Sequence, residues 1–269
     1  MRVSSLLFRT FVALVFVFLL LPIVMVVLTS FSDGAVLKFP PTDLTLRWYR
    51  AINPEFIAAL KVSLIVSTGT TLIATVAGTM ASLALVRGRF PGRTALSAFC
   101  LSPLMVPTLV IGVASFQFAN QLWDITHLSL LGTIPGLILA QSAFTIPFVI
   151  RAAIAGQAHF DAAVEEAALN LGATPWQTFW RVTSPILLPG VVSGAVFAFV
   201  MSFDDVPVAL FMGGGDVMTF PVKIYTSIEF SFDADLMAIS TLVIGASLVV
   251  MLILDRLIGV DKFFGAARV

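Results

Sequence analysis

Two pairs of adjacent carboxylates stand out in a chain that has few charged residues. Glu165 is followed by Glu166, and Asp204 by Asp205, whereas only 11% of the 269 residues are charged. Carboxylates can ligate a metal ion, carry out acid–base chemistry, attract a cationic solute or pair with a basic group on a partner protein. Which of these kinds of chemistry applies depends on the segments of the chain in which the two pairs lie.

The composition identifies an integral membrane protein. Hydrophobic residues make up 59% of the sequence and the mean hydropathy is +1.04. Soluble domains usually carry roughly 25% charged residues, and a chain of this size in water could not bury so much apolar surface. The net charge of zero provides no general attraction for nucleic acid.

Six apolar stretches are long enough to cross a bilayer as helices, so we expect an all-α, polytopic membrane protein. The apolar run from Phe11 to Leu28 exceeds the roughly 7–15 residues of a signal-peptide core, so we expect a retained first span and not a cleaved signal. The six stretches are residues 8–29, 57–86, 95–118, 133–155, 186–203 and 236–258.

The basic residues predict how these spans are oriented. Six spans place both termini on one side, and that side receives ten basic residues against five on the other, which accounts for all 15. The turn at residues 87–93, RGRFPGR, is the strongest local marker. Because basic residues accumulate in cytoplasmic loops, we expect cytoplasmic termini, a cytoplasmic glutamate pair and an aspartate pair at the outer end of the fifth span.

The segment with the glutamate pair is predicted to form a helical hairpin. Residues 161–171, DAAVEEAALNL, favour a helix, and Gly172 suits the left-handed position that ends one. Thr174, Pro175 and Gln177 then supply an N-cap, a first helical position and a capping box. The alternative is an amphipathic hairpin lying on the membrane, but such a hairpin is expected to be basic and this one is acidic.

This hairpin resembles the EAA loop of bacterial ABC-importer permeases. The family pattern is E-A-A, three residues, G, nine residues, then I-x-L-P. The chain departs from it at Val182 and Ser184, where the pattern has Ile and Leu. It matches the pattern at Glu166, Ala167, Ala168, Gly172 and Pro185.

The resemblance implies that the hairpin is a coupling helix, which docks into a cleft of a separate ATP-binding subunit. Glu166 and Gly172 take the central roles, and we expect Glu165 to be a bystander. The resemblance also implies a type I ABC-importer permease (MetI-like) fold with six transmembrane helices. The implied parts are a first helix with its outer segment (1–55), a permease core (56–258) with the coupling loop at about 156–185, and a cytoplasmic tail (259–269).

The segment with the aspartate pair resembles the spermidine/putrescine permease subunits of the C type. It reads M-S-x-D-D-V, a Gly turn and P-x-K-I-Y, and the likeness runs from L-R-W-Y at 46–49 to the last span. This implies a di- or polyamine solute, although related subunits move opines, 4-aminobutyrate or aminophosphonates. We expect Asp204 and Asp205 to line the pathway or gate, with cation–π attraction from Phe203. The remaining acidic residues of this region are expected to form a solvated outer face: Asp216, Glu229, Asp233 and Asp235.

The absence of an ATP-binding motif indicates which partner proteins to expect. No G-x-x-x-x-G-K-[ST] occurs, so ATP hydrolysis is expected on a separate ATP-binding subunit, present in two copies. A second homologous permease subunit and an extracytoplasmic solute-binding protein would complete the importer in the bacterial inner membrane. We expect no cofactor and no metal site, since Cys100 is the only cysteine and His127 and His159 are predicted on opposite sides.

Two other kinds of membrane protein are alternatives to a permease subunit. A secondary transporter usually has more spans and internal repeats, and no repeat is evident. An intramembrane metal-dependent enzyme could use Asp204 and Asp205, but the sequence contains neither H-E-x-x-H nor G-x-S-x-G.

Overall fold

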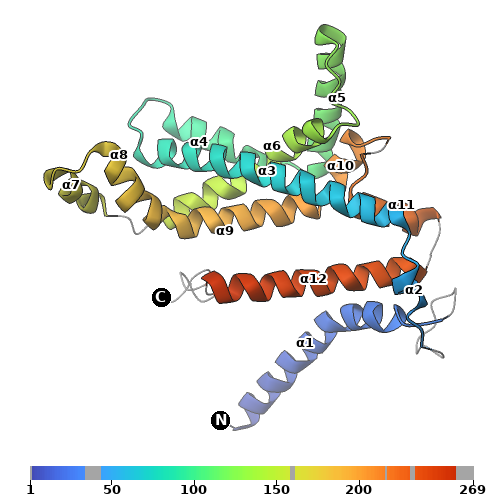
Figure 1. Cartoon of the computed structure of the whole chain (residues 1–269). Coiled ribbons are helices and arrows are strands. Elements are labelled where there is room, and N and C mark those ends of the chain that lie inside the picture. Colours follow the sequence, from blue (N-terminus) through green and yellow to red (C-terminus); the bar gives the residue numbers. More distant parts are fainter. Residues whose placement is uncertain (1, 34–43, 158–160, 216, 231–233, 259–269) are drawn as a thin grey trace. The chain divides into compact units, whose positions relative to one another are not determined.

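The computed structural model describes all residues except 1, 34–43, 158–160, 216, 231–233 and 259–269 (Figure 1). Apart from two isolated β-bridges, every regular element in the described part is helical, so the predicted all-α class is confirmed. The chain forms two compact units. One comprises residues 2–57 with 224–258, and the other comprises residues 58–223.

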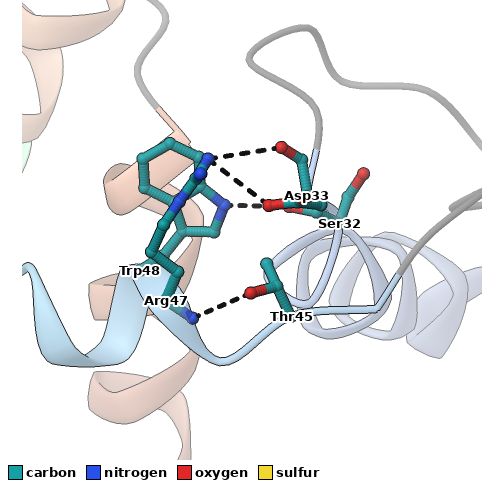
Figure 2. A network of polar contacts seen from close by, with 5 residues as sticks. All are labelled: Ser32, Asp33, Thr45, Arg47 and Trp48. Atoms are coloured by element: carbon teal, nitrogen blue, oxygen red, sulfur yellow. Dashed lines mark hydrogen bonds and ion pairs between the residues drawn. The ribbon is translucent and has the colours of Figure 1, made fainter.

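The first unit contains α1 (Arg2–Thr29), α2 (Arg47–Arg50) and α12 (Ala234–Ile258), and α12 contacts both α1 and α2. A polar network joins the end of α1 to α2 (Figure 2). Trp48 Nε1 donates to the Ser32 carbonyl over 2.8 Å, and the Arg47 guanidinium pairs with Asp33 over 3.4 Å. The same guanidinium lies 4.5 Å from the centre of the Trp48 ring. The L-R-W-Y motif therefore anchors the segment that follows the first span.

The second unit holds the hairpin and the segment with the aspartate pair. Its helices, with α11 leading out of it, are α3 (Pro54–Arg87), α4 (Arg93–Leu101), η1 (Ser102–Met105), α5 (Thr108–Thr126), α6 (Ile134–Gly156), α7 (Ala162–Asn170), α8 (Pro175–Thr178), η2 (Phe179–Thr183), α9 (Ser184–Phe203), α10 (Pro207–Met212) and α11 (Phe220–Phe230).

The predicted third span, residues 95–118, is a bent pair and not a single rod. Arg93–Met105 and Thr108–Thr126 meet at 105°. The bend follows Pro103 and falls at Pro107, which has no N–H to continue a helical hydrogen-bond ladder.

The other predicted spans appear as helices at their expected places. Within the described residues, four helices are long and apolar enough to cross a membrane, or five if the bent pair counts as one span. The last predicted span lies in α12, whose described apolar part is Leu236–Val249. These helices are compatible with the six predicted spans. The four are Leu7–Thr29, Pro54–Arg87, Ile134–Gly156 and Pro175–Phe203.

Small residues spaced four positions apart on α9 let α6 and α9 pack closely. Gly190, Gly194 and Ala198 are all buried. A Cβ atom at Gly190 would lie 2.8 Å from the Ala152 carbonyl oxygen and 3.0 Å from Gly156 Cα, so glycine is required there. The α6–α9 pair is therefore the frame that carries the hairpin at one end and the aspartate pair at the other (Figure 1).

Candidate functional site

The first helix of the hairpin begins and ends as its sequence predicts. The Asp161 side chain caps α7 by accepting a hydrogen bond from the Ala163 N–H over 2.9 Å. Gly172 follows α7 with a φ of +89°, which is the left-handed conformation that favours glycine. No atom lies within 4 Å of where its Cβ would be, so the backbone angle alone accounts for glycine here.

The second helix of the hairpin begins with the predicted capping box. The Gln177 N–H donates to the Thr174 hydroxyl over 3.3 Å, and the Thr174 N–H donates to Gln177 Oε1 over 2.9 Å. This second helix is not confined to the hairpin. The helix continues from Pro175 through the π-helical turn η2 into α9 and ends at Phe203 (Figure 1). A displacement of the corner at Gly172 is therefore transmitted along this continuous helix to the fifth span.

The tip of the hairpin presents apolar and acidic side chains outward. Glu166 and Ala167 are exposed and Ala168 is half-buried, while Pro185, further along, is also exposed. Two large apolar side chains of the hairpin are also open, since Leu171 is 88% exposed and Trp176 is 70% exposed. Exposed apolar side chains such as these can contribute to a surface that binds another protein.

Glu165 points in another direction and contacts its own chain. Its Oε1 atom lies 2.9 Å from Arg87 Nη1, at the last residue of α3. The same oxygen accepts a hydrogen bond from the buried hydroxyl of Thr183, in the last position of η2. Sequence patterns do not predict this contact, because Arg87 and Glu165 are 78 residues apart.

The adjacent aspartates at the other end of α9 have opposite environments. Asp204 is exposed, whereas Asp205 is only 6% exposed. Asp205 Oδ2 accepts hydrogen bonds from Gln141 Nε2 over 3.2 Å and from the Ala209 N–H over 2.9 Å. Gln141 in turn accepts a hydrogen bond from the Ser202 hydroxyl. Asp205 therefore links α6, α9 and α10 from the inside of the fold.

The environment of Asp205, which follows the end of the Pro175–Phe203 span, also changes its acidity. Burial raises the pKa of its carboxyl to about 6. Hydrogen bonds from the backbone of Ala209 and Val208 and from the Gln141 side chain lower the pKa, and the neighbouring charge of Asp204 raises it. The effect of burial on the pKa exceeds the opposing effect of the hydrogen bonds. Without these donors the pKa would rise further, so they help the carboxyl to keep its charge.

The other predicted site residues near the aspartate pair are Phe203 and the acids of the outer face. Phe203 is half-buried and stacks on Phe199, with ring centres 6.0 Å apart. Glu229 is exposed. Three acids of the predicted outer face lie outside the description: Asp216 and Asp233 fall on undescribed residues, as does the side chain of Asp235.

The glutamate and aspartate pairs do not form one site. They lie near opposite ends of the continuous helix Pro175–Phe203, which has 29 residues and spans about 40 Å at ~1.5 Å per residue. Within the described residues, no group of three or more His, Cys, Asp or Glu could hold a metal ion. An apolar cavity of about 430 Å³ between α5, α6 and α10 has only one polar lining side chain, Ser115, and its lining includes no carboxylate to pair with an ammonium group.

Comparisons with known proteins find similar permease proteins. Two Escherichia coli (strain K12) proteins are each 28% identical. The putrescine transport system permease protein PotI matches over 86% of this chain and 83% of its own length. The spermidine/putrescine transport system permease protein PotC matches over 95% and 94%. The sulfate transport system permease protein CysT of the same strain is 30% identical over 78% of this chain and 79% of its own.

A solved structure and a family model show the fold and the family. The crystal structure of a bacterial ABC transporter that imports the acidic polysaccharide alginate contains a chain with a TM-score of 0.74 and 16% identity, covering 96% of this chain and 97% of that one. The expected permease fold is thereby confirmed. The model of the binding-protein-dependent transport system inner membrane component matches residues 69–260. The chain therefore belongs to this family of inner-membrane permease subunits of ABC importers, which are not enzymes.

Proposed function

We propose that this permease subunit forms half of the pathway for a small amine-bearing solute, spermidine or putrescine, which an extracytoplasmic binding protein delivers. The observation that carries the proposal is the pair of unlike carboxylates at the end of α9, exposed Asp204 beside buried Asp205. A protonated polyamine needs carboxylates along its route, and exposed carboxylates at a pathway mouth attract cations. The similarity to PotC over 95% of the chain supports the same solute class.

The two aspartates divide the task. Asp204 contacts the ammonium groups because its side chain is accessible. Asp205 holds the connection between α9 and α10 in place through Gln141 and Ala209, and so fixes where Asp204 is presented. Phe203, half-buried beside Asp204, offers a ring face to the same cation.

The hairpin is the contact with the ATP-binding subunit. Its exposed Glu166 and the open side chains of Leu171 and Trp176 are accessible to a partner protein. Two ATP-binding subunits and a second permease subunit complete the complex, and the hairpin and both termini lie in the cytoplasm. The contact involves Glu166, Ala167, Ala168, Gly172 and Pro185 of the EAA pattern.

A second candidate solute is sulfate, because CysT is 30% identical to this chain. An exposed carboxylate at the pathway repels a divalent anion, so the acidic residue at position 204 favours the cationic solute. Other amine-bearing solutes, such as an opine, 4-aminobutyrate or an aminophosphonate, fit the same carboxylate and remain the nearest alternatives.

Uptake by the reconstituted complex tests the proposal. The permease is co-reconstituted in liposomes with its partner permease, ATP-binding subunit and binding protein, and uptake of labelled spermidine, putrescine, 4-aminobutyrate and sulfate is compared with ATP inside. We expect ATP-dependent uptake of the two polyamines. Uptake of sulfate without uptake of any amine would overturn the proposal.

A further inference from the structure

We propose that Glu165 is a positioning residue that braces the coupling hairpin against α3 and α9, so that a movement of the hairpin reaches both helices together. The proposal rests on the coupling role assigned to the hairpin above. It gives a function to a residue that the EAA pattern leaves out and that lies beside the pattern's own Glu166.

In the brace, one carboxylate oxygen of Glu165 contacts both Arg87 and Thr183. Arg87 ends the 34-residue helix α3, and its Nη1 atom lies 2.9 Å from Glu165 Oε1. The Thr183 hydroxyl donates to the same oxygen from the base of α9. The side chain of Glu165 is 21% exposed and that of Arg87 is 34% exposed, so water screens the pair only in part.

Besides this contact, α7 packs against α8 and η2, which follow it in the chain. The helix α7 has nine residues, and the space where a Cβ of Gly172 would lie, at the corner between α7 and α8, is open. A short helix joined through such a corner can tilt about it when a partner pushes on it. A side-chain tether in the first turn of α7 opposes the tilt, so that a push moves α3 and α9 instead.

The tether also meets α9 where its helical ladder is altered. Thr183 is 1% exposed and closes the π-helical turn Phe179–Thr183. Pro185 follows and has no N–H, so the carbonyl four residues earlier, at Arg181, loses its usual helical donor. Turns of the π type inside α-helices frequently occur at functional positions. The brace therefore contacts the continuous helix at a π-helical turn, where its regular hydrogen-bond pattern is already interrupted.

The neighbouring residues in sequence make good references. Glu166 is exposed and is assigned to the ATP-binding subunit, so it reports on docking. Arg89 is exposed, lies two residues from Arg87 and carries the same charge in the same turn. Because a partly exposed ion pair contributes little to stability, removing the brace is expected to leave the complex assembled.

The test measures uptake and ATP hydrolysis in the same proteoliposomes, with the complete complex, the binding protein and labelled putrescine. The variants are Glu165→Gln, Arg87→Gln and the charge exchange Arg87→Glu with Glu165→Arg. We expect each single variant to co-purify with the ATP-binding subunit and to hydrolyse ATP, while the amount of solute moved per ATP falls about tenfold, within the usual range of coupling between sites. The charge exchange restores most of that ratio, and the control Arg89→Gln leaves it unchanged.

The outcomes separate the brace from the coupling role itself. If Glu165→Gln and Arg87→Gln keep the normal ratio of uptake to hydrolysis, or if the charge exchange is no better than the single variants, the brace is overturned. If Glu166→Arg leaves both assembly and uptake normal, the coupling role of the hairpin fails instead. The charge exchange tests the ion pair itself, while unchanged co-purification and ATP hydrolysis in the single variants separate a coupling role from a loss of structure.

Discussion

Gln141 and Asp205 are joined by a hydrogen bond of 3.2 Å between two buried side chains that are 64 residues apart. The bond connects the middle of α6 to the turn between α9 and α10. It places Asp205 inside the fold at the same point of the chain where Asp204 is exposed. The two residues should therefore respond differently when each carboxylate is removed.

Asp204→Asn is expected to lower polyamine uptake without loss of stability. An exposed carboxylate that attracts the solute contributes charge to the pathway but few contacts to the fold. We expect about a tenfold fall in uptake at low solute concentration, equivalent to about 1.4 kcal/mol, and an unchanged thermal midpoint of the purified complex. Normal spermidine and putrescine uptake by this variant would contradict the role proposed for Asp204.

Asp205→Ala is expected to affect stability first. The substitution leaves the buried Gln141 amide and the Ala209 N–H without their acceptor, and each unsatisfied buried group costs about 1–3 kcal/mol. The thermal midpoint of the complex should fall measurably, and uptake should fall with the amount of folded protein. A variant as stable as the parent protein would show that Asp205 does not hold the turn.

Gly190→Ala is expected to weaken the packing of α6 on α9. The new Cβ would lie 2.8 Å from the Ala152 carbonyl oxygen and 3.0 Å from Gly156 Cα, and both are backbone atoms that cannot move aside cheaply. Overpacking of this kind typically costs about 1–3 kcal/mol. Gly245→Ala is the matched control, because no atom lies within 4 Å of a Cβ there and its φ is not left-handed. Thermal unfolding in detergent compares the two, and equal midpoints would contradict the close packing.

The sequence predicts those features that depend on neighbouring residues. The left-handed glycine at 172, the capping box of Thr174 and Gln177 and the small residues at 190 and 194 each arise within a few positions of the chain. The family resemblance then connects these local features with a function in transport. Local rules of helix initiation, termination and packing are sufficient for this part of the molecule.

The sequence does not predict the contacts that depend on the packing of distant segments. Arg87 meets Glu165 across 78 residues, and Gln141 meets Asp205 across 64. Adjacent acids such as Asp204 and Asp205 look equivalent until the fold buries one of them. The sequence also does not predict that the second helix of the hairpin is continuous with the fifth span, from Pro175 to Phe203, through a π-helical turn that precedes Pro185.

Gly172→Ala is expected to strain the corner of the hairpin without any steric clash. Its φ of +89° disfavours a side chain, at a cost of about 1–2 kcal/mol, although the space around it is open. Gly92 is the matched control, because its φ is +82°, it also has no atom within 4 Å of a Cβ, and it lies in a different turn. Both variants should lose similar stability, but only Gly172→Ala should lose uptake relative to the amount of folded complex. Equal uptake in the two variants would mean that the corner of the hairpin has no special part in transport.

Glu166→Arg is expected to abolish uptake by disrupting the contact with the ATP-binding subunit. The side chain is exposed, so the substitution does not disturb the interior, but it places a cation where the partner's surface is expected to accept a carboxylate. Like charges that meet at an interface oppose binding, so co-purification of the ATP-binding subunit should fall together with uptake. Glu166→Gln, which removes the charge without reversing it, should have a smaller effect on both.

Because Glu165 is already paired with Arg87 inside the chain, it cannot replace Glu166 at that surface without giving up the brace. Full uptake by Glu166→Arg would therefore place the contact with the ATP-binding subunit elsewhere on the chain.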